Sequence, residues 1–173
     1  AKIMNRDYWD KIDYLPIKHV IEEPAEIEAL LDKEGFTHTR RVTFNGEIFV
    51  EQGYMPVRCV GINPETDERI FRYKENVIEG GRYLKPDDYG VLIGSILAKD
   101  LKAEVGDLIQ IKTRTRYGGN QTFEFLEIVG ILNTPNPYIN KGTVFLPLAR
   151  ADETLFMEGA VTEIVLGFAE WVE

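Results

Sequence analysis

The sequence predicts an α+β fold, with mostly antiparallel sheets and a few helices. Strand-like apolar runs follow one another along the chain, and only single helical segments interrupt them. The succession of strand, helix and strand over residues 90–113 is compatible with one parallel crossover. The 173 residues suit one domain, or two small lobes that share a core.

The first clear element is a helix expected over residues 24–33. It opens with a proline, which suits the first helical turn, and a glycine follows its last residue closely. Two strands are then expected over residues 37–44 and 47–52. A hairpin turn at Asn45-Gly46 would join them, because Asn-Gly favours two-residue hairpins.

The later elements follow the same logic of apolar runs broken by turn residues. Ser95 is expected to cap a helix, and Gly94 to permit close backbone approach where a strand passes into that helix. Residues 133–140, with two prolines, are expected to form a loop. The remaining expected elements are strands over 55–62, 90–93, 108–113, 122–132, 144–146 and 161–167, and helices over 64–74, 96–103 and 149–157.

Composition narrows the function classes. The formal net charge is −9, from 29 acidic and 20 basic residues, and no basic stripe is present, so a nucleic-acid partner is not expected. The single cysteine, Cys59, rules out an internal disulfide and lies in an apolar run typical of the core. No stretch approaches 18 consecutive apolar residues, which predicts no membrane-spanning helix, and no signal peptide is seen. The abrupt chain ends suggest a piece of a longer protein.

No constellation of residues predicts catalysis, a metal site or a cofactor. His19 and His38 lack a nearby cysteine or ligand-like spacing, so no metal is expected. The glycine pairs at 80–81 and 118–119 match no phosphate-binding loop, so no nucleotide is expected either. Adjacent carboxylates are most simply solvated side chains of an acidic protein; they are Glu22-Glu23, Asp87-Asp88, and Glu65 with Asp67 and Glu68.

An ordered series of short motifs does carry a resemblance. It runs through 60–65 (VGINPE), 80–84 (GGRYL), 91–98 (VLIGSILA), 105–109 (VGDLI), 129–131 (VGI) and 144–148 (VFLPL). In order and spacing the series resembles the extracytoplasmic core domain of MacB-like and lipoprotein-release permeases of ABC transporters, in the FtsX-like permease superfamily. The resemblance extends from about Val20 to Gly167.

The resemblance implies a non-catalytic domain, residues 1–173, inserted between the first and second transmembrane helices of a cell-membrane protein. The domain would lie in the periplasm or on the outer face, with a porter-like α/β lobe and a more variable β-rich lobe. A separate cytoplasmic ATPase subunit would hydrolyse ATP, and a second permease copy or paralogue would pair with the first. The domain would relay the nucleotide-driven motion to export or release of a lipoprotein, peptide or other envelope substrate. Because the insertion joins two adjacent membrane helices, Ala1 and Glu173 are expected to lie close together.

In lipoprotein-release members a hairpin holds a periplasmic carrier protein, and by position that hairpin falls on Lys112 to Thr122. Its Gly118-Gly119 tip differs from a longer, proline-bearing segment. The hairpin is the candidate contact for a carrier or adaptor protein, through Lys112, Arg114, Arg116 and Tyr117.

Strand alternation would place the three cations of this hairpin on one face and Thr113, Thr115 and Tyr117 on the other. A functional hairpin is expected to project with few contacts, so that Arg114→Glu with Arg116→Glu would impair transport at an unchanged melting temperature. The alternative is a solvated hairpin whose charges protect an exposed edge.

Two other function classes stay open. The chain is alternatively a stand-alone extracytoplasmic ligand- or peptide-binding module, with an aromatic pocket lined by Tyr73, Tyr83, Tyr89 and Tyr138. It is otherwise a small hydrolase that uses an unrecognised carboxylate pair. The isolated domain is expected to be monomeric or weakly dimeric, because domains of charge −9 repel one another at low salt.

Overall fold

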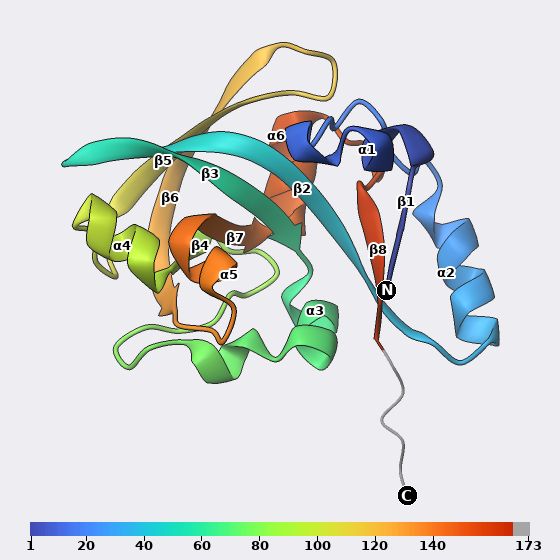
Figure 1. Ribbon diagram of the computed structural model, residues 1–173, viewed down its shortest axis with the longest axis horizontal. Coiled ribbons are helices and arrows are strands. Elements are labelled where there is room, and N and C mark those ends of the chain that lie inside the picture. The colour runs from blue at the N-terminus through green and yellow to red at the C-terminus, as the bar shows by residue number, and fades with distance from the viewer. Residues whose placement is uncertain (168–173) are drawn as a thin grey trace, which may run out of the picture.

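The structure is a computed structural model that describes residues 1–167. Figure 1 shows strands wrapped around a central core, with helices at the periphery. The strands are β1 (Lys2–Met4), β2 (Thr37–Val50), β3 (Gly53–Ile62), β4 (Gly90–Gly94), β5 (Leu108–Arg114), β6 (Asn120–Leu132), β7 (Thr143–Pro147) and β8 (Glu163–Gly167). The α-helices are α1 (Arg6–Asp10), α2 (Pro24–Lys33), α3 (Pro64–Phe71), α4 (Ser95–Leu101), α5 (Pro137–Gly142) and α6 (Leu148–Leu155). Among these residues no helix has the length and apolar character needed to cross a membrane.

The strands form one connected sheet in the order β1-β8-β2-β3-β7-β4-β6-β5. β2 also pairs with β5, which closes the six strands from β2 to β5 into a barrel. Every pairing is antiparallel except β3–β7 and β4–β6, so the expected α+β class with mostly antiparallel pairing is confirmed. The expected division into two lobes is not confirmed by this single sheet.

The longest strand, β2, corrects one prediction. Asn45-Gly46 is not a hairpin turn: both residues lie inside β2, opposite Arg58 and Val57 of β3, and the turn falls at Glu51-Gln52. A Cβ on Gly46 would lie 2.9 Å from Ile111 Cγ2. The glycine therefore serves the close approach of β5 to β2 rather than a turn.

Of the other features predicted from local sequence, some are confirmed and some are wrong. The helix over Pro24–Lys33 is confirmed at both ends. Ser95 does not cap its helix, because Gly94 holds the N-cap position and no side chain caps it. Gly94 does provide the expected close approach, since a Cβ there would collide with the carbonyl oxygens of Ile139 and Asn140. Those carbonyls belong to α5, which forms where a loop was expected.

The main core fills the barrel with side chains such as Phe44, Ile48 and Ile111. A smaller cluster, built on Val60, Leu92 and Phe145, packs on the other side of the β3–β7–β4 strands. Both clusters lie against the same sheet, so the strands are held rigidly in relation to one another.

The two ends of the described chain lie side by side (Figure 1). β1 pairs with β8 from Lys2↔Val165 to Met4↔Glu163, and the Leu166 amide donates to the Ala1 carbonyl at 2.8 Å. The expected proximity of the termini therefore holds for the described residues, while Glu173 lies outside them.

Candidate functional site

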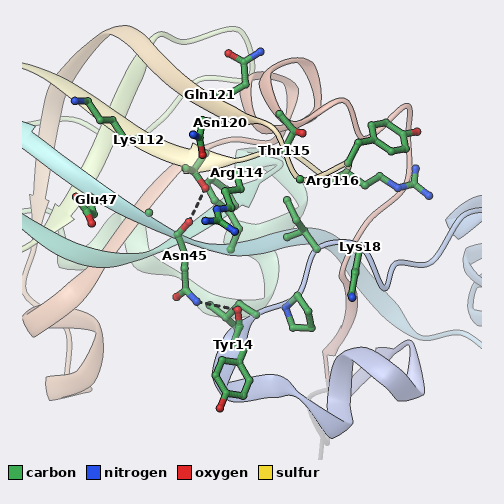
Figure 2. A pocket seen from close by; sticks show the side chains of 18 of the residues that line it. Tyr14, Lys18, Asn45, Glu47, Lys112, Arg114, Thr115, Arg116, Asn120 and Gln121 are labelled. Carbon is green, nitrogen blue, oxygen red and sulfur yellow. Dashed lines mark hydrogen bonds between the residues drawn. The ribbon is translucent and has the colours of Figure 1, made fainter.

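The predicted contact hairpin lines a cleft of about 930 Å³ (Figure 2). One wall is the hairpin over residues 112–122, and the opposite wall is the segment over residues 14–18. The floor comes from β2 and β3, through residues 44–47 and 56–57. Three stretches distant in sequence thus converge at one site, because β2 pairs with both β3 and β5.

Asn45 ties the two walls together at the floor of the cleft. Its side-chain amide donates to the Tyr14 carbonyl at 2.9 Å, and its own carbonyl accepts a hydrogen bond from Thr113 Oγ1 at 2.6 Å. Figure 2 shows both contacts as dashed lines. The separation of the walls is therefore set by one residue of β2.

The hairpin tip is anchored to the body of the domain. The Arg116 amide donates to the Leu155 carbonyl at 3.1 Å, its guanidinium donates to the Met157 carbonyl at 3.3 Å, and it forms an ion pair with Glu22. Its side chain is only 11% exposed. The expectation that the hairpin projects with few contacts is therefore wrong at Arg116.

The four predicted contact residues divide by direction. Figure 2 shows Arg114 pointing from the hairpin toward β2, whereas Lys112 and Arg116 point away to either side. Lys112 lines the cleft, but its ammonium lies 4.4 Å from the centroid of the ring of Phe49, which is not a cleft residue. Tyr117 lines the cleft and is 67% exposed. The predicted common cationic face fails because β5 ends at Arg114, so strand alternation does not extend to Arg116.

Arg114 is the cation best placed to meet a ligand. It is exposed, and among residues 1–167 no ion pair or hydrogen bond of its guanidinium is found. Asn120 and Gln121 of β6 also line the cleft and add amide groups. Sequence reasoning did not find Asn45 or Lys18, which lines the opposite wall, because nothing in their local pattern marks them.

The described cleft residues supply binding groups rather than an acid–base pair. Glu47 is the one carboxylate among them, and they include no histidine, cysteine or serine. A guanidinium with neighbouring amides and tyrosines suits a carboxylate or an acidic peptide segment. Across residues 1–167, no group of three His, Cys, Asp or Glu side chains is arranged to hold a metal ion.

A second charged cluster is buried at the other end of β2. Arg41 donates from Nε and Nη2 to the two carboxylate oxygens of Asp67, at 2.7 and 2.9 Å, and its guanidinium lies 3.8 Å from the Phe71 ring centroid. Burial disfavours the charge of Arg41, but the hydrogen bonds and charge of Asp67 outweigh this and raise its pKa. Beside them, Glu163 accepts from Thr43 Oγ1 and pairs with Lys2 at 3.1 Å. This cluster clamps α3, β1 and β8 to β2.

The other sequence candidates have structural roles. Arg82 donates to both carboxylate oxygens of Asp88, at 2.6 and 3.0 Å, and these hydrogen bonds lower the Asp88 pKa. His38 contacts Asp32 at 2.6 Å and Glu28 at 3.1 Å.

The four tyrosines expected to line one pocket lie at separate places in the structure. Tyr73 and Tyr83 pack against the smaller core cluster. Tyr89 is covered by the Arg150 guanidinium, 4.4 Å from its ring centroid. Tyr138 is 83% exposed on α5. The aromatic groups of the cleft are Tyr14 and Tyr117 instead.

No protein-family model matches the sequence, and no curated protein matches it. Solved structures do match the fold. The extracellular domain of the noncanonical ABC-type transporter YknZ from Gram-positive bacteria has a TM-score of 0.62 and 13% identity, over 99% of this chain and 85% of that one. The periplasmic region of MacB from Actinobacillus actinomycetemcomitans has a TM-score of 0.58 and 12% identity, over 86% of this chain and 66% of that one.

A domain of a permease protein from Porphyromonas gingivalis is also similar, with a TM-score of 0.56 and 17% identity over 84% of this chain and 68% of that one. At these identities the similarity establishes the fold. This chain has the fold of extracytoplasmic domains of ABC transporter permeases, as the ordered motifs of the sequence predicted.

Proposed function

We propose that this chain is a non-catalytic extracytoplasmic domain of an ABC transporter permease, which relays nucleotide-driven motion to the export or release of an envelope substrate. The observation that carries the proposal is the match in fold to the extracellular domain of YknZ over 99% of this chain. The adjacent chain ends support it, because a domain inserted between two neighbouring membrane helices must return to the membrane where it left.

Within this proposal the domain lies between the first and second membrane helices of a longer permease. A cytoplasmic ATPase subunit supplies the energy, and a second permease copy or paralogue supplies the opposing domain. The cargo is a lipoprotein, a peptide or another envelope substrate. Motion of the membrane helices enters through β1 and β8.

Strand β2 is the element suited to carry that motion. Its 14 residues correspond to about 45 Å of extended backbone. It pairs with β8 at the end where the chain termini lie, and with β3 and β5 at the end where the cleft lies. β3 pairs with β2 continuously from Arg41 to Val50, between the β8 pairs at the base and the β5 pairs at the cleft, so a displacement at the base would reach the cleft through one continuous ribbon.

The cleft is the proposed contact for a carrier or adaptor protein. Its positive Arg114 in a chain of net charge −9 favours an acidic segment of the partner and steers its approach. Tyr117 and Tyr14 supply aromatic contact area of the kind enriched at binding hot spots. Lys112 flanks the cleft, and Arg116 acts by anchoring the hairpin.

The cleft also favours a second function, a stand-alone extracytoplasmic module for a ligand or peptide. Its volume of about 930 Å³ is within the range of small-molecule and peptide sites. The two functions differ in membrane attachment, because a permease domain remains with the membrane after an alkaline wash and a stand-alone module does not.

Cysteine labelling in intact cells that express the full-length protein tests the proposal. Tyr138→Cys places a thiol at a position that is 83% exposed, whereas Cys59 is fully buried and serves as the internal control. A membrane-impermeant maleimide should label the variant before lysis and leave the unaltered chain unlabelled at Cys59. The labelled protein should stay in alkaline-washed membranes and copurify with an ATPase subunit.

Two results would count against the proposal. Labelling that requires permeabilised cells would place the domain in the cytoplasm. Labelled protein released by the alkaline wash would support the stand-alone module.

A further inference from the structure

Phe125 occupies a strained backbone position in the middle of β6. Its φ is +59°, and six residues other than glycine have positive φ within residues 1–167. Four of these, Leu15, Arg72, Lys102 and Phe156, are helix C-caps, where a left-handed residue is common. Phe125 lies within a strand, where the left-handed conformation is costly for a bulky side chain.

A β-bulge causes this conformation. Ile109 pairs with Leu126 and Ile111 pairs with Phe123, so Glu124 and Phe125 together face Gln110. Glycine is the residue that such a bulge favours. The Phe125 side chain is 81% exposed, so burial in the domain does not compensate for the strain. The fold itself therefore gives no reason for an aromatic ring at this position.

The ring borders a shallow apolar hollow of about 430 Å³ on the outer face of the barrel. Phe49 and Leu108 also line it, and Leu108 is 72% exposed. Tyr54 extends the surface, because its ring stacks on Phe49 with centroids 5.4 Å apart. Large apolar side chains gathered at an exposed site indicate a contact surface.

The charges around the hollow are acidic. Glu51 and Glu124 line it, and no lysine or arginine does. Neither glutamate forms an ion pair or hydrogen bond within residues 1–167, so both carboxylates are available to a cationic group. Lys112 is the cation beside the hollow: its ammonium lies 4.4 Å from the centroid of the Phe49 ring, although Lys112 lines the cleft and not the hollow.

We propose that this hollow binds a segment of a partner protein that carries an apolar side chain flanked by lysine or arginine. The apolar side chain would pack against Phe125, Leu108 and Phe49, and the flanking cations would meet Glu51 and Glu124. A second copy of the chain brings the same two glutamates and a net charge of −9, so like charges oppose self-association. An anionic membrane surface is disfavoured for the same reason. The inference does not depend on the proposed permease function.

The variant Phe125→Gly tests whether the ring contributes to binding or to the stability of the fold. Glycine adopts the left-handed conformation without strain, and this relief offsets the greater conformational entropy that glycine gives the unfolded chain, so the variant should unfold at a urea concentration no lower than the unaltered chain. A lower midpoint would mean that the ring stabilises the fold, and this would overturn the proposal. Tyr138→Ser, which removes a similarly exposed aromatic outside the hollow, is the matched control and should leave the midpoint unchanged.

Titration of the labelled 173-residue chain with synthetic peptides tests the chemistry. A peptide with a Phe-Leu centre flanked by lysines should shift the amide signals of residues 108–110 and 124–126. Phe125→Gly should weaken this binding about tenfold or more, as expected for a hot-spot aromatic, and Tyr138→Ser should not weaken it. The same peptide with glutamates in place of lysines should bind at least about tenfold more weakly, because like charges oppose it.

Every other outcome contradicts the proposal. No binding of the lysine peptide, or binding that Phe125→Gly leaves intact, means that the hollow is not this site. Flotation of the chain with phosphatidylcholine vesicles that Phe125→Gly abolishes would assign the surface to lipid. Concentration-dependent self-association lost in Phe125→Gly would assign it to a second copy.

Discussion

Charged residues lie near both ends of strand β2, and the two places balance their charges differently. Arg41 belongs to β2 itself, whereas Arg114 belongs to β5, which pairs with β2 at the cleft. At the base, Arg41 is 5% exposed and bonded to Asp67, which is completely buried. At the cleft, Arg114 is exposed and has no ion pair within residues 1–167. A buried charge must be neutralised by a partner inside the fold, whereas water solvates an exposed charge and leaves it available to a ligand. The base therefore holds its strands together through a buried pair, whereas the cleft presents an unpaired charge, as the proposed binding role requires.

The largest expected effect is at the base. Arg41→Met should destabilise the chain by about 3–5 kcal/mol, because it leaves the Asp67 carboxylate buried without its partner. Urea unfolding measures the change. Arg40→Met is the matched control: its pair with Glu28 is partly exposed, so about 1 kcal/mol or less should be lost.

The double variant Arg41→Met with Asp67→Leu sharpens this test. Replacement of a buried pair by apolar groups is often neutral, so it should recover most of the loss. A loss in the double variant as large as in Arg41→Met would show that the guanidinium packing on Phe71, not the charge pair, stabilises the base.

A smaller effect is expected midway along β2. Gly46→Ala should cost about 1–3 kcal/mol relative to Gly53→Ala, because the new Cβ crowds Ile111 and the Lys112 carbonyl, at 2.9 and 3.3 Å. Gly53 has nothing within 4 Å of its Cβ position. Both glycine-to-alanine changes alter the unfolded chain equally, so the difference between the two variants reports the crowding at Gly46. Equal midpoints in urea would contradict the close approach of β5.

Substitutions of the two arginines of the hairpin should have different effects on stability. Arg116→Glu should cost about 1–2 kcal/mol, because it removes the bond to the Met157 carbonyl and places a carboxylate beside Glu22. Arg114→Glu should change stability by less than about 0.5 kcal/mol, as at most exposed positions. Transport in cells should fall in Arg114→Glu at an unchanged melting temperature.

Charge exchange provides the control for Arg116. Arg116→Glu combined with Glu22→Arg should regain part of the lost melting temperature, because the opposite charges meet again. An unchanged deficit would mean that the guanidinium bond to the Met157 carbonyl, not the ion pair, anchors the tip.

The smallest effect concerns a partly exposed pair away from β2. Hydrogen bonds from Arg82 lower the Asp88 pKa in the folded chain, so this pair stabilises the fold above the unfolded pKa and loses its effect as pH falls through the folded value. Asp88→Asn should therefore cost up to about 1 kcal/mol at neutral pH and less near pH 3. Urea midpoints at the two pH values measure this. A cost that stays equally large at the lower pH would indicate a role other than charge.

The sequence predicts elements that depend on neighbouring residues. The helix over 24–33 has its proline and glycine signals within a few residues of its ends. The Asn45-Gly46 turn failed because a contact with Ile111, distant in sequence, decides what that glycine does. The prediction for Arg116 failed because alternation holds only within the strand, and β5 ends at Arg114.

The candidate site depends on pairing that no local pattern reveals. Closure of the barrel joins Glu47 to Lys112, and this brings the hairpin over β2. Asn45 and Lys18 enter the site only through that closure. The strain at Phe125 is equally invisible in sequence, since it results from a register shift between β5 and β6. Several of the ordered motifs contain a glycine that the packing requires, such as Gly61 and Gly94, where a Cβ would collide with a neighbour.

Because the two ends of the described chain are adjacent, the resistance of the domain to force depends on the direction of that force. β8 is held by five residue pairs to β2 and by three to β1, and the two ends of the described chain, Ala1 and Gly167, lie on the same side. A pull that drives the two ends apart loads the β1–β8 bonds one at a time, as in a zipper. A pull or push on both ends together, along the strands, loads all the bonds of β8 at once in shear. A stroke along β2, as the proposed function requires, would therefore meet a stiff domain, whereas sideways separation of the two ends would break the β1–β8 bonds first.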